Sequence, residues 1–214
     1  MKVFFLTVFL TASLIHLTAS VKHNNKVRAC SKVFLLSSLL GWYCFAASAP
    51  RTVVTLALAF SWLGDVLLIP KGLKWFVPGG VSFLLSHLFF VQAYRADVLF
   101  SAISPAVILL SALVYAAAVL LIFKALKPHL PKLLFFPMLS YLLVNGAMNC
   151  FALYRLLSCK TPASAVTFIG ALLFFCSDAI LFFTRFNKNT RFKSHFAVML
   201  SYLSGEFLIT RGLI

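Results

Sequence analysis

Long, continuous runs of apolar residues dominate the sequence, and short basic or Pro/Gly-containing segments separate them. A helix needs about 20 apolar residues to cross the hydrocarbon core of a bilayer. Because the runs do not alternate between apolar and polar positions, they favour α-helices over membrane-spanning β-strands. The pattern predicts an all-α, polytopic transmembrane bundle of about eight spans, near residues 2–20, 33–49, 52–70, 75–95, 101–123, 133–156, 163–184 and 194–213.

The composition agrees with a membrane protein. Hydrophobic residues make up 62% of the 214 positions and charged residues 11%, and the mean hydropathy is +1.01. A water-soluble domain needs a far larger polar surface. No connection between the runs is long enough for a soluble domain, so we expect a single integral membrane domain over residues 1–214. The first run has Lys2, an apolar centre and the small residues Ala19 and Ser20, and is therefore either a cleaved signal peptide or the first span.

The basic residues predict an orientation in the membrane. The formal net charge is +15, but the lysines and arginines lie in short connections rather than in a stripe, which argues against nucleic-acid binding. By the positive-inside rule we expect the odd-numbered connections in the cytosol, facing an anionic leaflet, and both termini on the lumenal or external side. Thirteen of the 19 lysines and arginines fall in these connections: Lys22, Lys26, Arg28, Lys32, Lys71, Lys74, Lys124, Lys127, Lys132, Arg185, Lys188, Arg191 and Lys193.

Two stretches in the third and seventh runs are similar, "LAFSWLGDVLLIPK" and "LLFFCSDAILFFTR". Each places an aspartate after a small residue and shortly before a basic connection, and the two runs are four apart. This favours a parallel duplication of four plus four spans. Asp65 precedes Lys71 by six residues and Asp178 precedes Arg185 by seven, which places both carboxyls about 10 Å inside the cytoplasmic boundary. We therefore expect the two aspartates to face each other.

Three of the four acidic residues, Asp65, Asp178 and Glu206, lie in predicted spans, and only Asp97 lies in a connection. An aspartate at membrane depth costs roughly 2.5–3.5 kcal/mol on insertion scales and faces the bundle interior or a wet cavity. The sequence places no lysine or arginine at membrane depth to neutralise the acids. The acids are therefore candidates for catalysis or proton transfer, the alternative being structural carboxyls hydrogen-bonded between helices.

Other polar residues in the spans are candidates for binding a substrate. His87 shares a helical face with Tyr94, and it relays protons, binds a head group or packs as a neutral side chain bonded to a neighbouring helix. Steps of four align Tyr141, Asn145 and Asn149, which line a pocket or hold helices together. Tyr202 and Glu206 share a face of the eighth run. Lys71, Lys74 or Arg191 could hold a phosphate, as could backbone amides if a helix began at "VPGG" (Val77–Gly80).

The cysteines and histidines predict no cofactor. Five cysteines are scattered along the chain without a CxxC pair, so we expect neither a disulfide framework nor a zinc site. His87 with nearby carboxyls is too small a set for a zinc hydrolase. The sequence therefore predicts no metal and no cofactor.

Four segments together resemble the YhhN family of eight-span membrane proteins, which includes the animal lysoplasmalogenases. They are "FSWLGDVLL", "GGVSFLLSHLFFVQAY", "GALLFFCSDAILFFTRF" and "YLSGEFLI". The resemblance implies that Asp65 and Asp178 are the family's two aspartates and His87 its histidine in the fourth span. The chain departs from the family pattern at Glu206, where glutamine is expected, and at Leu203, where an aromatic residue is expected.

The resemblance implies hydrolysis of the vinyl-ether bond of a lysophospholipid, lysoplasmalogen, to a fatty aldehyde and glycerophosphocholine or glycerophosphoethanolamine. It also implies an endomembrane location, in the endoplasmic reticulum, among membrane lipids; a homodimer is a further possibility. Two carboxyls suit this chemistry, one as a general acid and the other as a stabilising anion. Paired intramembrane acids also describe a proton-coupled transporter, and a non-catalytic lipid-binding protein is a third reading.

Overall fold

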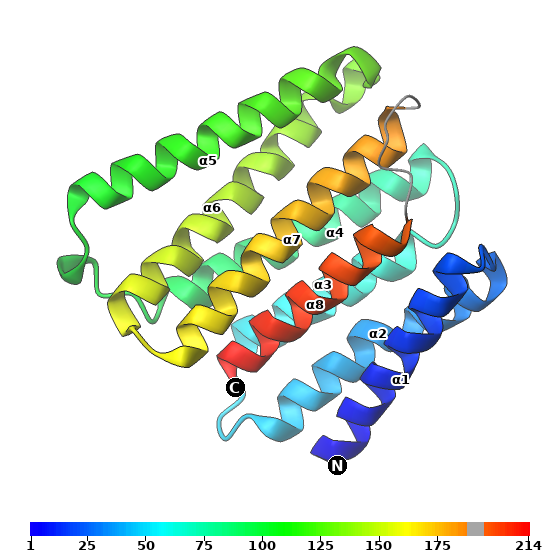
Figure 1. Cartoon of the computed structure of the whole chain (residues 1–214), viewed down its shortest axis with the longest axis horizontal. Helices are drawn as coiled ribbons and strands as arrows, with labels where there is room; N and C mark the ends of the chain where they lie inside the picture. Colours follow the sequence, from blue (N-terminus) through cyan, green and yellow to red (C-terminus); the bar gives the residue numbers. More distant parts are fainter. Residues whose placement is uncertain (188–194) are drawn as a thin grey trace. The chain divides into compact units, whose positions relative to one another are not determined.

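The computed structural model describes residues 1–187 and 195–214, and every one of the eight predicted runs coincides with a helix (Figure 1). The prediction of a helical bundle is confirmed. The described elements are α1 (Lys2–Val21), α2 (Asn25–Ala46), α3 (Thr52–Leu67), α4 (Leu73–Arg95), α5 (Pro105–Leu126), α6 (Phe135–Cys159), α7 (Pro162–Phe186) and α8 (His195–Leu213), with the short 3₁₀ helices η1 (Phe100–Ala102), η2 (Lys127–His129) and η3 (Lys132–Leu134).

Six of the described helices are long and apolar enough to cross a membrane, namely α1, α2, α4, α5, α6 and α7. α3 is equally apolar but has 16 residues. A chain with six such helices is a multi-pass membrane protein. Three residues of the predicted seventh connection, Lys188, Arg191 and Lys193, lie outside the described residues.

The helices form two compact units. The first contains residues 1–93 and 213–214, and the second contains residues 94–212. α1 to α3 and most of α4 belong to the first unit, while α5 to α7 and nearly all of α8 belong to the second. The boundary falls where the predicted four-plus-four repeat would divide the chain; the repeat itself and the single domain stay predictions.

Local sequence signals explain where several helices begin and end. Asn24 caps α2, because its Oδ1 accepts a hydrogen bond from the Val27 amide at 3.2 Å. Thr161 caps α7 in the same way through the Ser164 amide at 3.2 Å, and Pro162 occupies the first turn. α6 ends where Lys160 takes a left-handed conformation with φ of 52°. These signals place α2 eight residues earlier than the predicted span at 33–49.

α4 also begins earlier than predicted. It starts at Leu73, so Pro78, Gly79 and Gly80 lie inside the helix and no helix start at "VPGG" is available to hold a phosphate. The chain turns instead at Gly72, whose φ of +117° glycine adopts readily. Gly79 packs closely against the end of α3, since a Cβ there would lie 2.8 Å from Leu68 Cδ2. The expectation that "VPGG" could hold a phosphate at a helix start was wrong, and Gly79 instead packs closely against α3.

In the first unit, polar bonds join neighbouring helices. His16 of α1 pairs through Nδ1 with Ser31 Oγ of α2 at 2.9 Å. The Trp62 indole of α3 donates to the Val33 carbonyl of α2 at 3.0 Å. Ser61 of α3 and Ser86 of α4 share a hydrogen bond of 2.7 Å. Small polar side chains of this kind hold helices together in membranes, where burial of apolar surface contributes little.

In the second unit, small residues let α7 and α8 approach closely. A Cβ on Gly170 would lie 2.7 Å from the Gly205 carbonyl oxygen, and a Cβ on Gly205 would lie 2.9 Å from the Gly170 carbonyl oxygen. Glycine at both positions brings the two backbones together, which strengthens packing between transmembrane helices. The close crossing fixes how α8 presents its buried polar residues to α7.

Candidate active-site clusters

Asp178 lies in the middle of a buried hydrogen-bonded cluster between α6 and α7. Its side chain is almost fully buried. Tyr141 Oη donates to Asp178 Oδ2 at 2.6 Å, and Asn145 Nδ2 donates to the same oxygen at 2.7 Å. Both donors come from α6, where a separation of four residues puts them on one face. The sequence predicted that Tyr141 and Asn145 share a face, and the structure shows that this face holds Asp178.

A third α6 residue continues this row. Asn149, one turn beyond Asn145, is fully buried and donates from Nδ2 to the Asn145 carbonyl oxygen at 3.0 Å and to Asn145 Oδ1 at 3.3 Å. The second bond orients the Asn145 amide so that its nitrogen points to Asp178. Within the described residues, Asn149 Oδ1 has no hydrogen-bond partner. A buried acceptor of this kind is costly unless a water or a ligand satisfies it.

α8 closes another side of α7 near Asp178. Ser177, the residue before Asp178, donates from Oγ to the Val198 carbonyl oxygen of α8 at 3.0 Å. The rings of Phe174 and Tyr202 meet edge-on with centroids 5.3 Å apart. Tyr202 and Glu206 are both buried on α8. The predicted site residues Asn145, Asn149, Tyr202 and Glu206 thus belong to the helices that surround α7.

Asp65 has a basic partner, contrary to the sequence-based expectation. Lys32 Nζ lies 3.1 Å from Asp65 Oδ1, with the two side chains 14% and 2% exposed. The expectation was wrong because α2 begins at Asn25, so Lys32 belongs to a helix and not to the first connection. A long lysine stem can place its ammonium group beside a carboxyl of the neighbouring helix. The pair offsets the cost of placing either charge in the membrane.

The aspartate clusters follow one pattern in the two units. In the first unit, Asp65 of α3 binds a side chain of α2; in the second, Asp178 of α7 binds two side chains of α6. Helices two and three of each predicted repeat therefore meet at their acidic residue. The expectation that the two aspartates face each other involves both units, and it stays a prediction.

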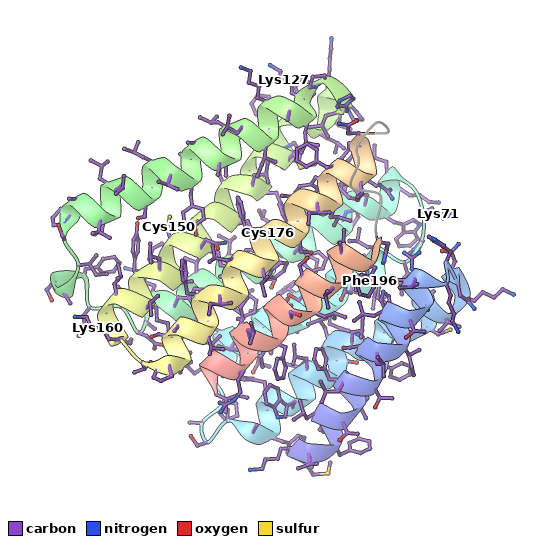
Figure 2. All side chains as sticks on the ribbon, viewed as in Figure 1. Lys71, Lys127, Cys150, Lys160, Cys176 and Phe196 are labelled. Atoms are coloured by element: carbon purple, nitrogen blue, oxygen red, sulfur yellow. The ribbon has the colours of Figure 1, made fainter. Side chains whose placement is uncertain are left out.

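Other predicted binding residues lie on α4 and in the connection that precedes it. His87 is fully buried in α4, and its Nδ1 lies 2.5 Å from the Phe83 carbonyl oxygen in the preceding turn. Tyr94 is fully buried near the end of α4. Lys71 lies exposed in the connection between α3 and α4, as Figure 2 shows. Arg191 lies outside the described residues.

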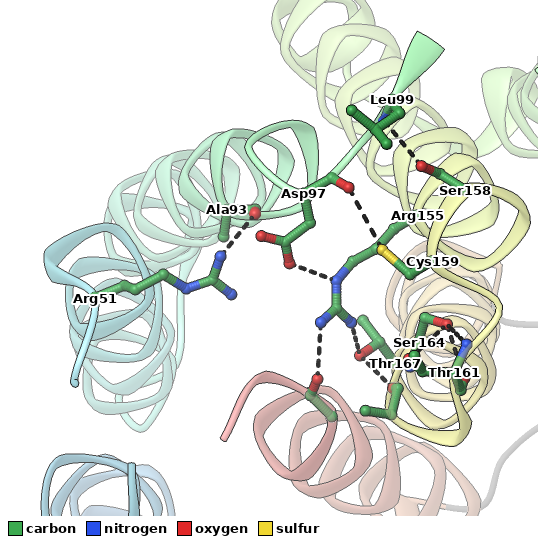
Figure 3. A network of polar contacts seen from close by, with 12 residues as sticks. Arg51, Ala93, Asp97, Leu99, Arg155, Ser158, Cys159, Thr161, Ser164 and Thr167 are labelled. Atoms are coloured by element: carbon green, nitrogen blue, oxygen red, sulfur yellow. Dashed lines mark hydrogen bonds and ion pairs between the residues drawn. The ribbon is translucent and has the colours of Figure 1, made fainter. Parts of the chain in front are cut away.

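A second polar network, which no sequence motif predicted, is centred on Arg155 (Figure 3). The buried guanidinium donates from Nε to Asp97 Oδ2 at 2.7 Å, from Nη1 to Thr167 Oγ1 at 2.8 Å and from Nη2 to the Gly212 carbonyl oxygen at 3.1 Å. Arg155 therefore ties α6 to the α4–α5 connection, to α7 and to the end of α8. The planar fork of the arginine side chain suits three simultaneous bonds.

Metal-ligating residues do not gather in the part of the chain that the structure describes. Across residues 1–187 and 195–214, no three side chains of His, Cys, Asp and Glu lie close enough together to hold a metal ion. All five cysteines are free thiols; among them Cys150 is buried and Cys176 exposed (Figure 2). The side chains that bond at the two aspartate clusters carry carboxyl, phenol, amide and ammonium groups.

Comparison with known proteins gives two matches. The sequence pattern of the YhhN family matches residues 27–213, from α2 to the end of α8. The chain is 30% identical over 181 residues to a human protein named lysoplasmalogenase TMEM86B, a match that covers 85% of this chain and 71% of the human protein. No solved structure matches the chain. Asp65, Asp178 and all the other predicted site residues lie within the region that the family pattern covers.

Proposed function

The chain belongs to the YhhN family, and from this premise we propose that it is a hydrolase that cleaves the vinyl-ether bond of lysoplasmalogen. The products would be a fatty aldehyde and glycerophosphocholine or glycerophosphoethanolamine. The observation that carries the proposal is the buried carboxyl of Asp178, which two side chains of α6 hold in one orientation. A carboxyl held in this way at membrane depth can transfer a proton to a lipid.

The reaction asks for an acid, an anion and a water molecule. Protonation of the outer vinyl carbon breaks the double bond and leaves an oxocarbenium ion on the carbon that bears the ether oxygen. Water adds to that carbon and loses a proton, which returns to the acid. The hemiacetal then collapses, so the carbon–oxygen bond breaks, the aldehyde forms and the glycerol hydroxyl receives a proton. Glycoside hydrolysis divides similar work between two carboxyls.

Asp178 is the proposed general acid. Its Oδ2 accepts the bonds from Tyr141 and Asn145, so we place the transferable proton on Oδ1. The two donors hold the plane of the carboxyl, which fixes the direction of proton transfer. Tyr141 and Asn145 are positioning residues in this scheme, and Asn149 orients the Asn145 amide.

Asp65 is the proposed second carboxyl. The ammonium group of Lys32, 3.1 Å away, favours its ionised form. An ionised carboxylate stabilises the positive charge of an oxocarbenium ion and can orient the attacking water, whose proton returns to Asp178. The different partners of the two aspartates, an ammonium group for Asp65 and uncharged donors for Asp178, support this division of roles.

The remaining predicted residues would bind the lipid. His87, Tyr94, Tyr202 and Glu206 are buried polar groups that can contact the glycerol backbone, and Lys71 is an exposed cation that can attract the phosphate. We place the odd-numbered connections in the cytosol on the distribution of basic residues. We also propose a location in the endoplasmic reticulum, which the family resemblance implies, and a homodimer.

Asn149 has a specific expected role. A lysoplasmalogen carries a free hydroxyl on the second glycerol carbon, and the buried Asn149 Oδ1 is an acceptor for it. One helical turn, about 5.4 Å, separates Asn149 from Asn145, which contacts Asp178. That distance suits a lipid whose vinyl carbon lies at Asp178 while its hydroxyl lies at Asn149.

Substituting Asn149→Leu should lower kcat/KM for lysoplasmalogen about 2- to 10-fold, the worth of one neutral hydrogen bond. The matched control is a 2-deoxy substrate that lacks the hydroxyl. On that substrate the variant should lose less activity than on lysoplasmalogen, because only the bond from Asn149 to the Asn145 amide is then missing. An equal loss on both substrates would mean that Asn149 acts only through the Asn145 amide or a water, and does not bind the lipid hydroxyl.

The proposal as a whole is tested with purified protein and two lipids of equal chain length, lysoplasmalogen and an acyl lysophospholipid. We expect release of free aldehyde from the first and no fatty acid from the second. Cleavage of the acyl lipid alone would show that the protein hydrolyses esters and not vinyl ethers. Movement of lysoplasmalogen across vesicle membranes without aldehyde release would show that the protein is a transporter and not a hydrolase.

A further inference from the structure

A groove runs along the outer face of α1 and α2, in the first unit. It encloses about 600 Å³, and its largest lining side chains are Phe4, Ile15 and Phe34. Its walls are almost wholly apolar, and two lining hydroxyls are satisfied by the protein: Thr7 Oγ1 donates to the Val3 carbonyl at 2.9 Å, and Ser31 Oγ donates to the Val27 carbonyl at 2.8 Å. Such walls suit a hydrocarbon chain.

The length of the groove matches one leaflet of a bilayer. Its α1 wall extends from Phe4 to Ile15, eleven residues or about 16 Å of helix. The hydrocarbon core of a bilayer is about 30 Å thick, so each leaflet contributes about half of that. One acyl chain lying parallel to the helices would fill the groove from end to end.

A cation lies at one end of the groove. Lys26, in the first turn of α2, is the lining residue nearest to the α1–α2 connection, and Lys22 lies within that connection. The N-terminus of α2 adds the partial positive charge of a helix dipole. No aspartate or glutamate occurs before Asp65, and Asp65 already pairs with Lys32. The positive charge at this end therefore favours a negatively charged head group.

We propose that the groove binds one acidic membrane phospholipid, with a chain along α1 and α2 and the phosphate at Lys26. α1 precedes residues 27–213, the region that matches the family pattern, so this site is built largely from a part of the chain outside that match. The predicted cytosolic side of the α1–α2 connection faces the leaflet that is rich in anionic lipids. The inference does not depend on the proposed reaction, and its test measures binding and not turnover.

The test is a lipid titration of the full chain in detergent, followed by native mass spectrometry. Phosphatidylserine and phosphatidylcholine with identical chains are the probes. We expect one phosphatidylserine to bind more tightly than phosphatidylcholine. Lys26→Gln should weaken phosphatidylserine binding about fivefold, the effect of one basic residue near a charged surface. The control Lys124→Gln removes an equal charge from α5, outside the groove, and should leave the affinity unchanged.

A second pair of variants tests the hydrocarbon part of the groove. Thr11→Phe places a ring in the groove and should abolish tight binding of both lipids, whereas Leu10→Phe, on an exposed α1 position outside the lining, should retain it. Equal affinity for the two lipids, or an unaltered affinity in Lys26→Gln, would overturn the proposal. So would displacement of phosphatidylserine by an equimolar amount of lysoplasmalogen, because the groove would then serve the substrate.

Discussion

Replacing Asp178 with asparagine is expected to lower the rate of vinyl-ether cleavage about 10²- to 10⁴-fold, the usual contribution of a general acid. Asparagine keeps the shape of the side chain and can still accept the hydrogen bonds from Tyr141 and Asn145. The variant should therefore fold and lose only the transferable proton. The measurement is kcat from aldehyde release by the purified protein, with the melting temperature in detergent as a record of folding.

The same substitution at two other positions completes the experiment. Asp65→Asn should also be severely impaired, because it removes the ionised carboxylate beside Lys32. Asp97→Asn is the matched control: Asp97 bonds to Arg155 in a structural network, so each folded molecule should turn over lysoplasmalogen at the original rate. Near-normal turnover in Asp178→Asn would refute its assignment as the acid, whatever the result at Asp65.

The largest effect on stability is expected from Arg155→Leu. The substitution leaves the Asp97 carboxylate and the Gly212 carbonyl oxygen without their arginine partner. Loss of one member of a buried charged network costs about 3–5 kcal/mol, and the partial exposure of Asp97, 28%, puts the expected value near the lower end. The melting temperature of the purified protein should fall by about 5–10 °C.

Two further variants separate the contribution of hydrogen-bond geometry to stability from the contribution of the positive charge. Arg155→Lys keeps the charge but lacks the planar fork that reaches Asp97, Thr167 and Gly212 at once, so it should recover less than half of the lost stability. Arg95→Leu removes an exposed arginine at the end of α4 and should melt like the original protein. A melting temperature unchanged in Arg155→Leu would show that the network does not hold the second unit together.

The sequence predicted the helices well because apolar runs of this length have few other stable forms in a membrane. It also predicted a shared face for Tyr141, Asn145 and Asn149, since the helical repeat alone determines which residues of one helix lie together. What that face contacts depends on the packing of two helices. The bonds from Tyr141 and Asn145 to Asp178 therefore appear only in the structure.

The errors arose where a residue near a helix end was assigned from its charge. Lys32 was placed in a connection because lysines mark cytosolic loops, yet the Asn24 cap starts α2 early and turns Lys32 toward Asp65. Arg155 lies at the end of the predicted run 133–156, and no sequence signal shows that α6 continues to Cys159 and buries it. In both cases a long basic side chain bonds an acid that is far away along the sequence, and the sequence does not show that the two residues are close in space.

The ion pair between Lys32 and Asp65 has a consequence for how the protein is made. Lys32 leaves the ribosome before α3 has been synthesised, so α2 reaches the lipid with an ammonium group that nothing yet neutralises. A lone lysine at that depth resists entry into lipid. α2 and α3 should therefore pass from the translocon into the bilayer together, as a hairpin, with the aspartate of the later helix completing the insertion of the earlier one.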